Sequence, residues 1–510
     1  MLTPIKKLHP YQERDIQILF DKMEQAPNQR LLYQLPTGGG KTVVFSEIAK
    51  RFIEKYNSKV AILTHRTELC GQTSATLKKI GVSNKIINSK SRATPANSNC
   101  VVAMVETLRN RIRSKKFSTA GIGLVIIDEA HHNSFRKLLG SFTEAFVIGV
   151  TATPFSSDTA LPINTTYDTL VIGEDIASLI ESGFLAKPQY FKYEVELNSL
   201  RTGLHGDFTV SSSNGLYGAP AMLDLLLRSY ELHAKGKKTL IFNNGVETSL
   251  KVRDRFEEAG IAVRHLDNKC TTEERNAILK WFKRTKGAVL TSVSILTTGF
   301  DEPTVQAVIL NRATTSVTLY HQMIGRGSRW LPAKKTFRII DHGNNCERFG
   351  DWHVPVNWQY VFEHPNEFAE QLNYTAGGGS VQSHAINPEL RAHFPETLEL
   401  SFDIENAYAA AVAEGKKPKT VLQLSMRQQA EMCITNADTL TQALHLAELL
   451  HPEADWRVKQ YIKCLDKPST DYKNWLIADY KDKLSTFIRK IYHLKNAIEV
   501  PAEADIEMIK

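Results

Sequence analysis

The chain has 510 residues, of which 42% are hydrophobic and 23% charged, values typical of a soluble globular protein and not of a disordered or fibrous one. The net charge of +8 is uneven, because residues 1–350 carry +15 and residues 351–510 carry −7. No apolar run approaches the roughly 20 residues of a membrane span, no secretory signal is recognisable, and the six cysteines form no CxxC pair, which argues against a zinc ribbon or disulfide framework and favours a cytoplasmic, nucleoid-associated location.

Short apolar runs alternate with longer helical stretches through residue 345. The first series of expected strands is Arg30–Leu35, Lys59–Thr64, Cys100–Val105, Gly123–Ile127 and Ala145–Val150, with helices such as Thr42–Tyr56 and Glu68–Ile80 between them. The second series is Lys238–Asn243, Ala262–Leu266, Ala288–Thr291, Val305–Leu310 and Thr336–Ile340. This rhythm is typical of parallel sheets covered by helices on both faces, so we expect two α/β domains.

The regions outside these series give the domain boundaries. The run Ser211–Gly215 indicates a glycine- and serine-rich loop, and we place a hinge near residues 195–220. Gly377-Gly378-Gly379 indicates a flexible joint, and residues 400–500 are expected to be helical. The predicted domains are residues 1–195, 196–345 and a mainly α-helical accessory domain at 346–510.

A phosphate-binding loop is predicted at Leu35-Pro36-Thr37-Gly38-Gly39-Gly40-Lys41-Thr42, between a strand and a helix. Glycines let backbone N–H groups approach phosphates, and the helix N-terminus adds positive potential. Lys41 would reach the β- and γ-phosphates of ATP, while the Thr42 hydroxyl would bind Mg²⁺. Leu35 replaces the first glycine of the general pattern.

A buried strand ending in two carboxylates follows in the sequence Val125-Ile126-Ile127-Asp128-Glu129-Ala130-His131. Asp128 suits a contact to Mg²⁺, and Glu129 suits the base that positions the attacking water. His131 has two interpretations, a residue that couples this strand to the next motif or a polar cap, and we favour coupling. His132 is expected to be structural.

These motifs resemble those of superfamily 2 helicases. Leu8-His9-Pro10-Tyr11-Gln12 is similar to the segment in which the glutamine reads adenine, which implicates Gln12. Thr64–Leu69 resembles motif Ia and Val105–Leu108 motif Ib, and the resemblance implies that His65, Arg66 and Thr107 contact the tracked strand. Thr151-Ala152-Thr153-Pro154 matches motif III, so Thr151 and Thr153 are implied to couple hydrolysis to movement.

The second series carries the remaining helicase-like motifs. Motif IV resembles Thr239–Asn243. Ser294–Pro303 is similar to motif V and implicates Thr298 in nucleic-acid contact and Gly299 and Asp301 in nucleotide binding. Tyr320–Arg329 is similar to motif VI, which implicates Gln322 in coupling. Arg326 and Arg329 are three residues apart, so on a helix both would face one side and reach the γ-phosphate as arginine fingers.

The resemblance implies two tandem RecA-like domains that close on ATP and grip a nucleic-acid strand alternately. DEAHH, SILTTGFDEP and YHQMIGRGSR look most like RadD-type DNA helicases, fungal mitochondrial branch-migration helicases and the translocase subunits of type I and type III restriction enzymes. That group implies duplex, forked or branched DNA, not RNA, and a role in repair or recombination. Two alternatives stay open, a motor subunit of a restriction or phage-defence system and a nucleic-acid-stimulated ATPase switch without strand separation.

The last 130 residues contain no recognisable motif and could bind a protein partner. Four of the six tryptophans follow residue 350, at positions 352, 358, 456 and 475, and we expect core positions in preference to base-stacking platforms. Residues Lys481–Lys495 would form a helix with one apolar and one basic face. This helix could contact a DNA strand or pack with a solvated face, and the sequence favours neither.

Overall fold

The computed structural model describes residues 8–89, 91, 98–156, 161–203, 207–293, 296, 300–375, 390, 393–397, 402, 404–413, 418–465 and 470–497. The chain divides into two compact units. The first unit, residues 1–202 and 206–381, contains both sheets and is called the motor unit. The second, residues 203–205 and 382–510, is called the helical unit.

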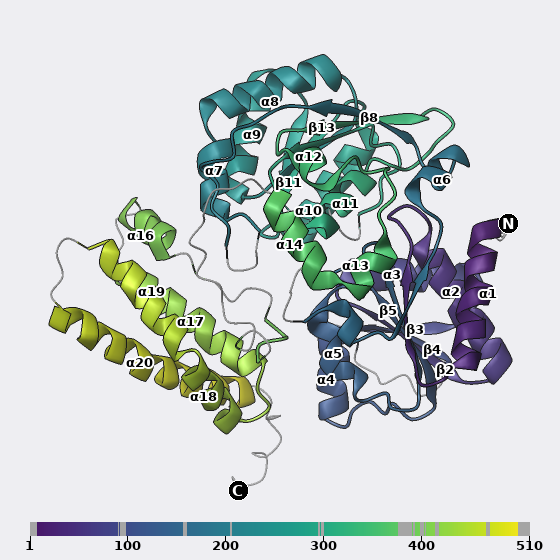
Figure 1. Ribbon diagram of the computed structural model, residues 1–510, viewed down its shortest axis with the longest axis horizontal. Coiled ribbons are helices and arrows are strands. Elements are labelled where there is room, and N and C mark those ends of the chain that lie inside the picture. The colour runs from purple at the N-terminus through teal and green to yellow at the C-terminus, as the bar shows by residue number, and fades with distance from the viewer. Residues whose placement is uncertain are drawn as a thin grey trace, which may run out of the picture. The chain divides into compact units, whose positions relative to one another are not determined.

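The first lobe of the motor unit is a parallel sheet of order β3-β4-β2-β5-β6-β1-β7 (Figure 1). Its strands are β1 Arg30–Gln34, β2 Lys59–Thr64, β3 Asn84–Ile87, β4 Cys100–Met104, β5 Ile122–Asp128, β6 Phe146–Thr151 and β7 Thr169–Ile172. Nearly every residue of the central strands is buried, as expected for strands covered on both faces. The helices are α1 Pro10–Gln25, α2 Lys41–Tyr56, α3 Thr67–Lys79, α4 Val105–Arg113, α5 Arg136–Leu139 and α6 Ile176–Glu181.

The second lobe is a parallel sheet of order β10-β11-β9-β12-β13-β8. Its strands are β8 Lys187–Lys192, β9 Thr239–Asn243, β10 Val263–Leu266, β11 Val289–Val293, β12 Ala307–Asn311 and β13 Thr336–Asp341. The helices around it are α7 Val210–Tyr217, α8 Pro220–His233, α9 Val246–Glu258, α10 Thr272–Arg284, α11 Val317–Gly325 and α12 Asn345–Phe349. The expected fold, two parallel-sheet α/β domains followed by helices, is therefore confirmed.

Strand β8 belongs to the second sheet, where it pairs with β13 along its whole length. It lies inside residues 1–195, which were assigned to the first domain. The sequence Lys-Pro-Gln-Tyr-Phe-Lys has too few apolar residues to be recognised as a strand, because β8 is an edge strand with one neighbour. The chain passes between the sheets in the short segment from α6 to β8, and not near residues 195–220.

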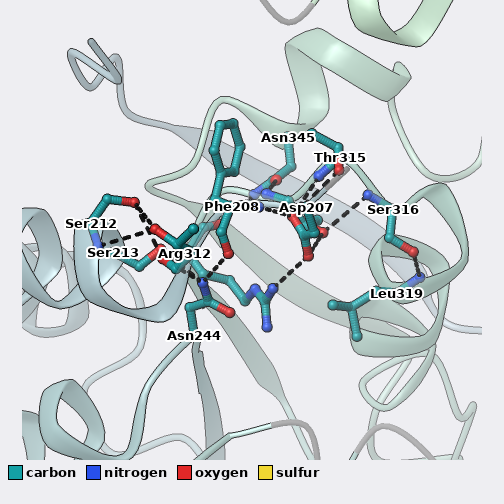
Figure 2. A network of polar contacts seen from close by, with 12 residues as sticks. Asp207, Phe208, Ser212, Ser213, Asn244, Arg312, Thr315, Ser316, Leu319 and Asn345 are labelled. Atoms are coloured by element: carbon teal, nitrogen blue, oxygen red, sulfur yellow. Dashed lines mark hydrogen bonds and ion pairs between the residues drawn. The ribbon is translucent and has the colours of Figure 1, made fainter. Parts of the chain in front are cut away.

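The segment expected to be a hinge and a glycine- and serine-rich loop is folded onto the second sheet. Figure 2 shows the contacts: Asp207 accepts hydrogen bonds from Arg312 Nη2 and Thr315 N, each at 2.9 Å, and Asn244 Nδ2 donates to Phe208 O at 2.9 Å. Residues 210–217 form helix α7, capped by the Thr209 side chain and anchored by the buried Tyr217. The loop prediction was wrong because capping and burial outweighed the low helix propensity of serine and glycine.

Two helices after the second sheet return to the first lobe. They are α13 Trp358–Glu363 and α14 Pro365–Thr375. Trp358 and Phe362 belong to the same apolar cluster as Leu32 and Phe155 of the first lobe, and Phe368 packs edge-on against Phe155 with ring centroids 5.2 Å apart. Residues 346–375 thus form part of the motor unit, although they were assigned to the accessory domain.

The helical unit contains α16 Ile404–Ala413, α17 Thr420–Thr435, α18 Leu440–Leu449, α19 His451–Lys463 and α20 Thr470–Ala497. Two apolar clusters hold these helices together, one around Leu446 and Leu484 and one around Val458 and Tyr480. The predicted joint at residues 377–379 lies outside the described residues. No helix in the described ranges has the length and apolar character needed to cross a membrane.

Candidate active site

The loop between β1 and α2 can be built only with glycine at two positions. Gly38 and Gly40 have φ angles of +99° and +89°, and Gly40 is the residue before the first turn of α2. A Cβ atom at Gly38 would lie 2.7 Å from Leu185 Cδ2, and one at Gly40 would lie 2.6 Å from Gln12 Nε2. The loop therefore places free backbone N–H groups and the positive end of the α2 dipole at one point, an arrangement that suits phosphate.

Lys41 opens α2 and sits next to the acidic end of β5. Its Nζ donates a hydrogen bond to Leu35 O at 3.2 Å. Burial lowers the pKa of Lys41, and the Glu129 and Asp128 carboxylates oppose that shift. A cation held by only one neutral acceptor at this point is available to anionic oxygens of a ligand.

Asp128 and Glu129 end strand β5, and both are buried. Burial, and next the charge of Glu129, raise the pKa of Asp128. Glu129 Oε2 is buried and accepts no hydrogen bond from the described residues; the nearest donor, His131 Nδ1, is 3.5 Å away. Two adjacent buried carboxylates, one of them with an unsatisfied oxygen, suit a divalent cation and a water molecule.

The backbone at Glu129 is left-handed, with a φ angle of +54°. For a residue with a side chain this conformation costs roughly 1–2 kcal/mol. Glu129 turns the chain sharply after the strand, so that its carboxylate follows Asp128 at the carboxyl end of β5. Ligands bind at that end of open parallel sheets.

A line of hydrogen bonds connects this acidic end with the second lobe. His131 Nδ1 lies 3.0 Å from Thr151 Oγ1, which donates to Thr153 O at 3.0 Å. Thr153 Oγ1 then donates to Thr318 Oγ1, on α11 of the second lobe, at 2.8 Å. The structure thus brings together the three residues expected to couple the motifs and adds Thr318.

The two arginines expected to reach the phosphates lie beside the loop. Arg329 Nη1 donates to Gly38 O at 3.0 Å, and its Nε donates to Asp301 Oδ1 at 3.0 Å. Arg326 donates to Phe300 O, and burial lowers its pKa to about 10. Both guanidinium groups are close enough to Lys41 to affect its pKa.

The helical geometry expected for these arginines was wrong. Helix α11 ends at Gly325, and the backbone N–H groups of Arg326 and Gly327 bond to Met323 O and Ile324 O, which tightens the last turn. Arg329 lies in a bridge with Leu185, beyond the helix. Its position comes from that bridge and from Asp301, and not from a shared helix face.

Gln12 and its aromatic neighbours lie at the edge of the loop. Gln12 Nε2 donates to Gly39 O at 3.3 Å, and Tyr11 Oη donates to the same oxygen at 2.7 Å. The rings of His9, Tyr11 and Phe184 form a cluster with centroid separations of 4.2–5.9 Å. Flat rings beside an amide suit the stacking and edge recognition of an adenine.

The remaining predicted residues occupy different environments. Thr37 packs against Gly325, where an added Cβ would lie 2.7 Å from Thr37 Cβ. Both ring nitrogens of His65 are buried and have no hydrogen-bond partner among the described residues, and the ring packs on His132 at 4.2 Å, so His65 does not face a strand directly. The others are Thr42, Arg66 and Thr107, all half-buried, and Gln322, which is buried in α11. Thr298 and Gly299 lie outside the described residues.

Sequence reasoning missed Thr318 and Lys334. The buried Lys334 Nζ donates to Val305 O at 2.7 Å and to Gly327 O at 2.8 Å, joining the segment after Asp301 to the loop that carries Arg326 and Arg329. Burial lowers its pKa to about 7. Thr318 and Lys334 belong to no recognised motif, so only their position next to motif VI could have drawn attention to them.

Comparison with known proteins places both lobes in families. Residues 5–156 match the family model "Type III restriction enzyme, res subunit", and residues 220–330 match "Helicase conserved C-terminal domain". IRC3 of Saccharomyces cerevisiae, named as an ATP-dependent helicase, is 32% identical over 66% of this chain and 51% of its own length. A 51.5 kDa protein of a Lactococcus phage is 31% identical over 65% of this chain and 70% of its own length.

Among solved structures, an HsdR subunit fragment of a type I restriction enzyme from Vibrio vulnificus superposes with a TM-score of 0.54 at 22% identity, over 68% of this chain and 66% of the fragment. This likeness shows a shared fold. The chain spans about half the length of its yeast relative. On the two family matches, the relatives and the two-lobed site, the chain belongs to the ATP-hydrolysing helicases of superfamily 2.

Proposed function

We propose that the chain is an ATP-driven motor that moves along DNA and remodels duplex, forked or branched substrates in repair or recombination, as its resemblance to RadD-type helicases suggests. ATP binds on the Thr37–Thr42 loop, Gln12 reads the adenine, and Thr42 and Asp128 hold Mg²⁺. The metal neutralises charge on the phosphates. Glu129 orients the attacking water and receives its proton.

The second lobe supplies the remaining groups of the proposed site. Arg326 and Arg329 stabilise charge that develops on the γ-phosphate, and Gly299 and Asp301 complete the nucleotide pocket. The line His131–Thr151–Thr153 reports the state of the nucleotide to α11, where Gln322 lies. Arg66, Thr107 and Thr298 contact the strand, and His65 supports that surface from inside.

The observation that carries this proposal is the hydrogen bond from Arg329 of the second lobe to Gly38 O in the phosphate loop of the first. A single site built from both lobes can be opened and closed by one nucleotide, which is the requirement for a motor. DNA is favoured over RNA because the first family model and the Vibrio fragment are both named for restriction enzymes. The basic excess of residues 1–350 suits a polyphosphate partner.

The test is the steady-state ATPase rate with single-stranded DNA, duplex DNA, a fork, a Holliday junction and RNA. We expect the strongest stimulation by forked or branched DNA. Lys41→Ala should abolish the rate, and Lys50→Ala, which removes a lysine from the same helix away from the loop, should not. Stimulation by RNA alone would overturn the choice of DNA, and indifference to every nucleic acid would overturn the motor.

A second candidate is the motor subunit of a restriction or phage-defence complex, favoured by the same two restriction-enzyme matches. In that case a tagged chain purified from its native cells should carry a nuclease or methyltransferase in stoichiometric amount. Recovery of the chain alone, with full stimulation by branched DNA, would favour the independent motor.

A further inference from the structure

The helical unit has an open groove between α17 and α20. Its volume is about 180 Å³, and its apolar wall consists of Leu422, Met426, Leu476 and Phe487. Gln423 adds an amide that can both donate and accept a hydrogen bond. An engineered protein cavity of about 150 Å³ holds benzene, so this groove has room for one six-membered aromatic ring.

A stacked pair of aromatic side chains stands next to the groove on α20. Trp475 and Tyr472, three residues apart, are 50% and 36% exposed, with ring centroids 5.8 Å apart and planes inclined by 27°. Two large rings this exposed on one helix face are uncommon, because burying them would be favourable. Trp352 and Trp358 are buried, as expected, but Trp475 is not.

Lys419 joins the two features. It lines the groove, and its Nζ lies 4.9 Å from the centre of the Trp475 ring. It directly precedes α17, and the sequence before it, Lys416-Lys417-Pro418, is also basic. The other charges in the groove, Asp479 and Lys483, form an ion pair at 2.7 Å, so the net charge of the lining is positive.

This combination fits a single-stranded nucleic acid. Unpaired bases expose flat faces that stack on Trp and Tyr, and the adjoining phosphates attract lysine. Bases inside a duplex offer neither face. A protein segment could use the apolar wall, but it would have no use for a stacked aromatic pair beside a cation.

We propose that the helical unit binds single-stranded nucleic acid, with one base stacked on Trp475 and Tyr472, a neighbouring base in the α17–α20 groove, and Lys419 on the phosphate between them. This inference rests on the proposed function only in that the motor must generate or meet unpaired strand. The acidic balance of residues 351–510 agrees with a small site and not with a broad DNA clamp.

The test measures binding of the full chain, without nucleotide, to fluorescein-labelled oligothymidylate of about 20 nucleotides, a length that covers one such site. Trp475→Ala should raise Kd roughly 5- to 150-fold, the loss of one stacked base. Trp475→Phe, which keeps a flat ring, should recover most of the affinity. Leu424→Ala is the matched control, since Leu424 is 55% exposed on α17 but does not line the groove.

Two further readings exclude a merely structural effect. Lys419→Ala should reduce the slope of log Kd against log salt by about 0.7, the value for one phosphate contact on a single strand. Oligothymidylate should quench tryptophan fluorescence in the wild type and much less in Trp475→Phe. Equal Kd and equal quenching in wild type and Trp475 variants would overturn the site, including the case in which Trp475→Ala instead abolishes capture of a protein.

The ATPase assay separates failure of this site from failure of the motor. At saturating forked DNA, Trp475→Ala should turn over ATP at the wild-type rate. If the wild type shows no stimulation by any nucleic acid but still binds oligothymidylate through Trp475, the motor proposal fails and the site stands. If stimulation is normal and Trp475→Ala binds oligothymidylate like the wild type, the site fails and the motor stands.

Discussion

The hydrogen bond from Thr153 to Thr318 gives a sharp test of how the two lobes cooperate. The two hydroxyls are 2.8 Å apart across the lobes, and Thr153 and Thr318 are 0% and 9% exposed. Thr318→Val keeps the shape of the side chain but leaves the Thr153 hydroxyl buried without a partner whenever the lobes close. Such a loss costs about 1–3 kcal/mol, so kcat/KM for ATP should fall roughly 5- to 150-fold.

The reciprocal change isolates the bond itself. Thr153→Val removes only the side-chain hydroxyl, because the contacts of Thr153 with Thr151 use its backbone N–H and carbonyl. In the double variant two methyl groups replace both hydroxyls, so its loss of kcat/KM should be smaller than the product of the single losses. The assay is DNA-stimulated phosphate release at varied ATP.

A matched control lies within one lobe. Thr291 is fully buried and hydrogen-bonds Asn243 and Ser249 of the same lobe, so Thr291→Val should lower the melting temperature and leave kcat/KM unchanged. Single losses that multiply in the double variant would show that the bond between Thr153 and Thr318 does not form in the working enzyme.

Three other changes test the site. Glu129→Gln should slow hydrolysis at least about 10²-fold while ATP stays bound, measured by single-turnover release and filter binding; normal turnover would remove Glu129 as the base. Arg329→Lys cannot donate to Asp301 and Gly38 together, so kcat should fall roughly 10²- to 10³-fold, and an unchanged kcat would rule out a role for this guanidinium. Burial lowers the pKa of Lys334 to about 7 from 10.5, so between these values the unfolded chain binds more protons and stability rises with pH. The melting temperature of wild type relative to Lys334→Met should therefore increase from pH 7 to pH 10, and parallel curves would contradict the buried lysine.

The sequence predicted the central strands well because strands buried on both faces are continuous apolar runs. The predicted range Lys59–Thr64 matches β2 residue for residue. It did not reveal β8, an edge strand, or α7, whose stability comes from the Thr209 cap and the burial of Tyr217. Tertiary contacts decide such segments, and they leave no periodic pattern.

The candidate site divides in the same way. The phosphate loop and the Asp-Glu pair were found because their chemistry requires neighbouring residues in the sequence. Thr318 and Lys334 were not, since each acts through a partner on another segment: Thr153 for the first, and Val305 and Gly327 for the second. Trp475 was expected in the core, and its exposure could be known only from the packing of α20.

The left-handed backbone at Glu129 sets activity against thermal robustness at this position. Glycine would adopt a φ angle of +54° without strain and return roughly 1–2 kcal/mol to the fold, while removing the carboxylate. Selection for heat resistance alone would therefore erode this position, and selection for turnover must hold it. A chain engineered for stability should be allowed to change around Glu129, and its conformational cost recovered elsewhere.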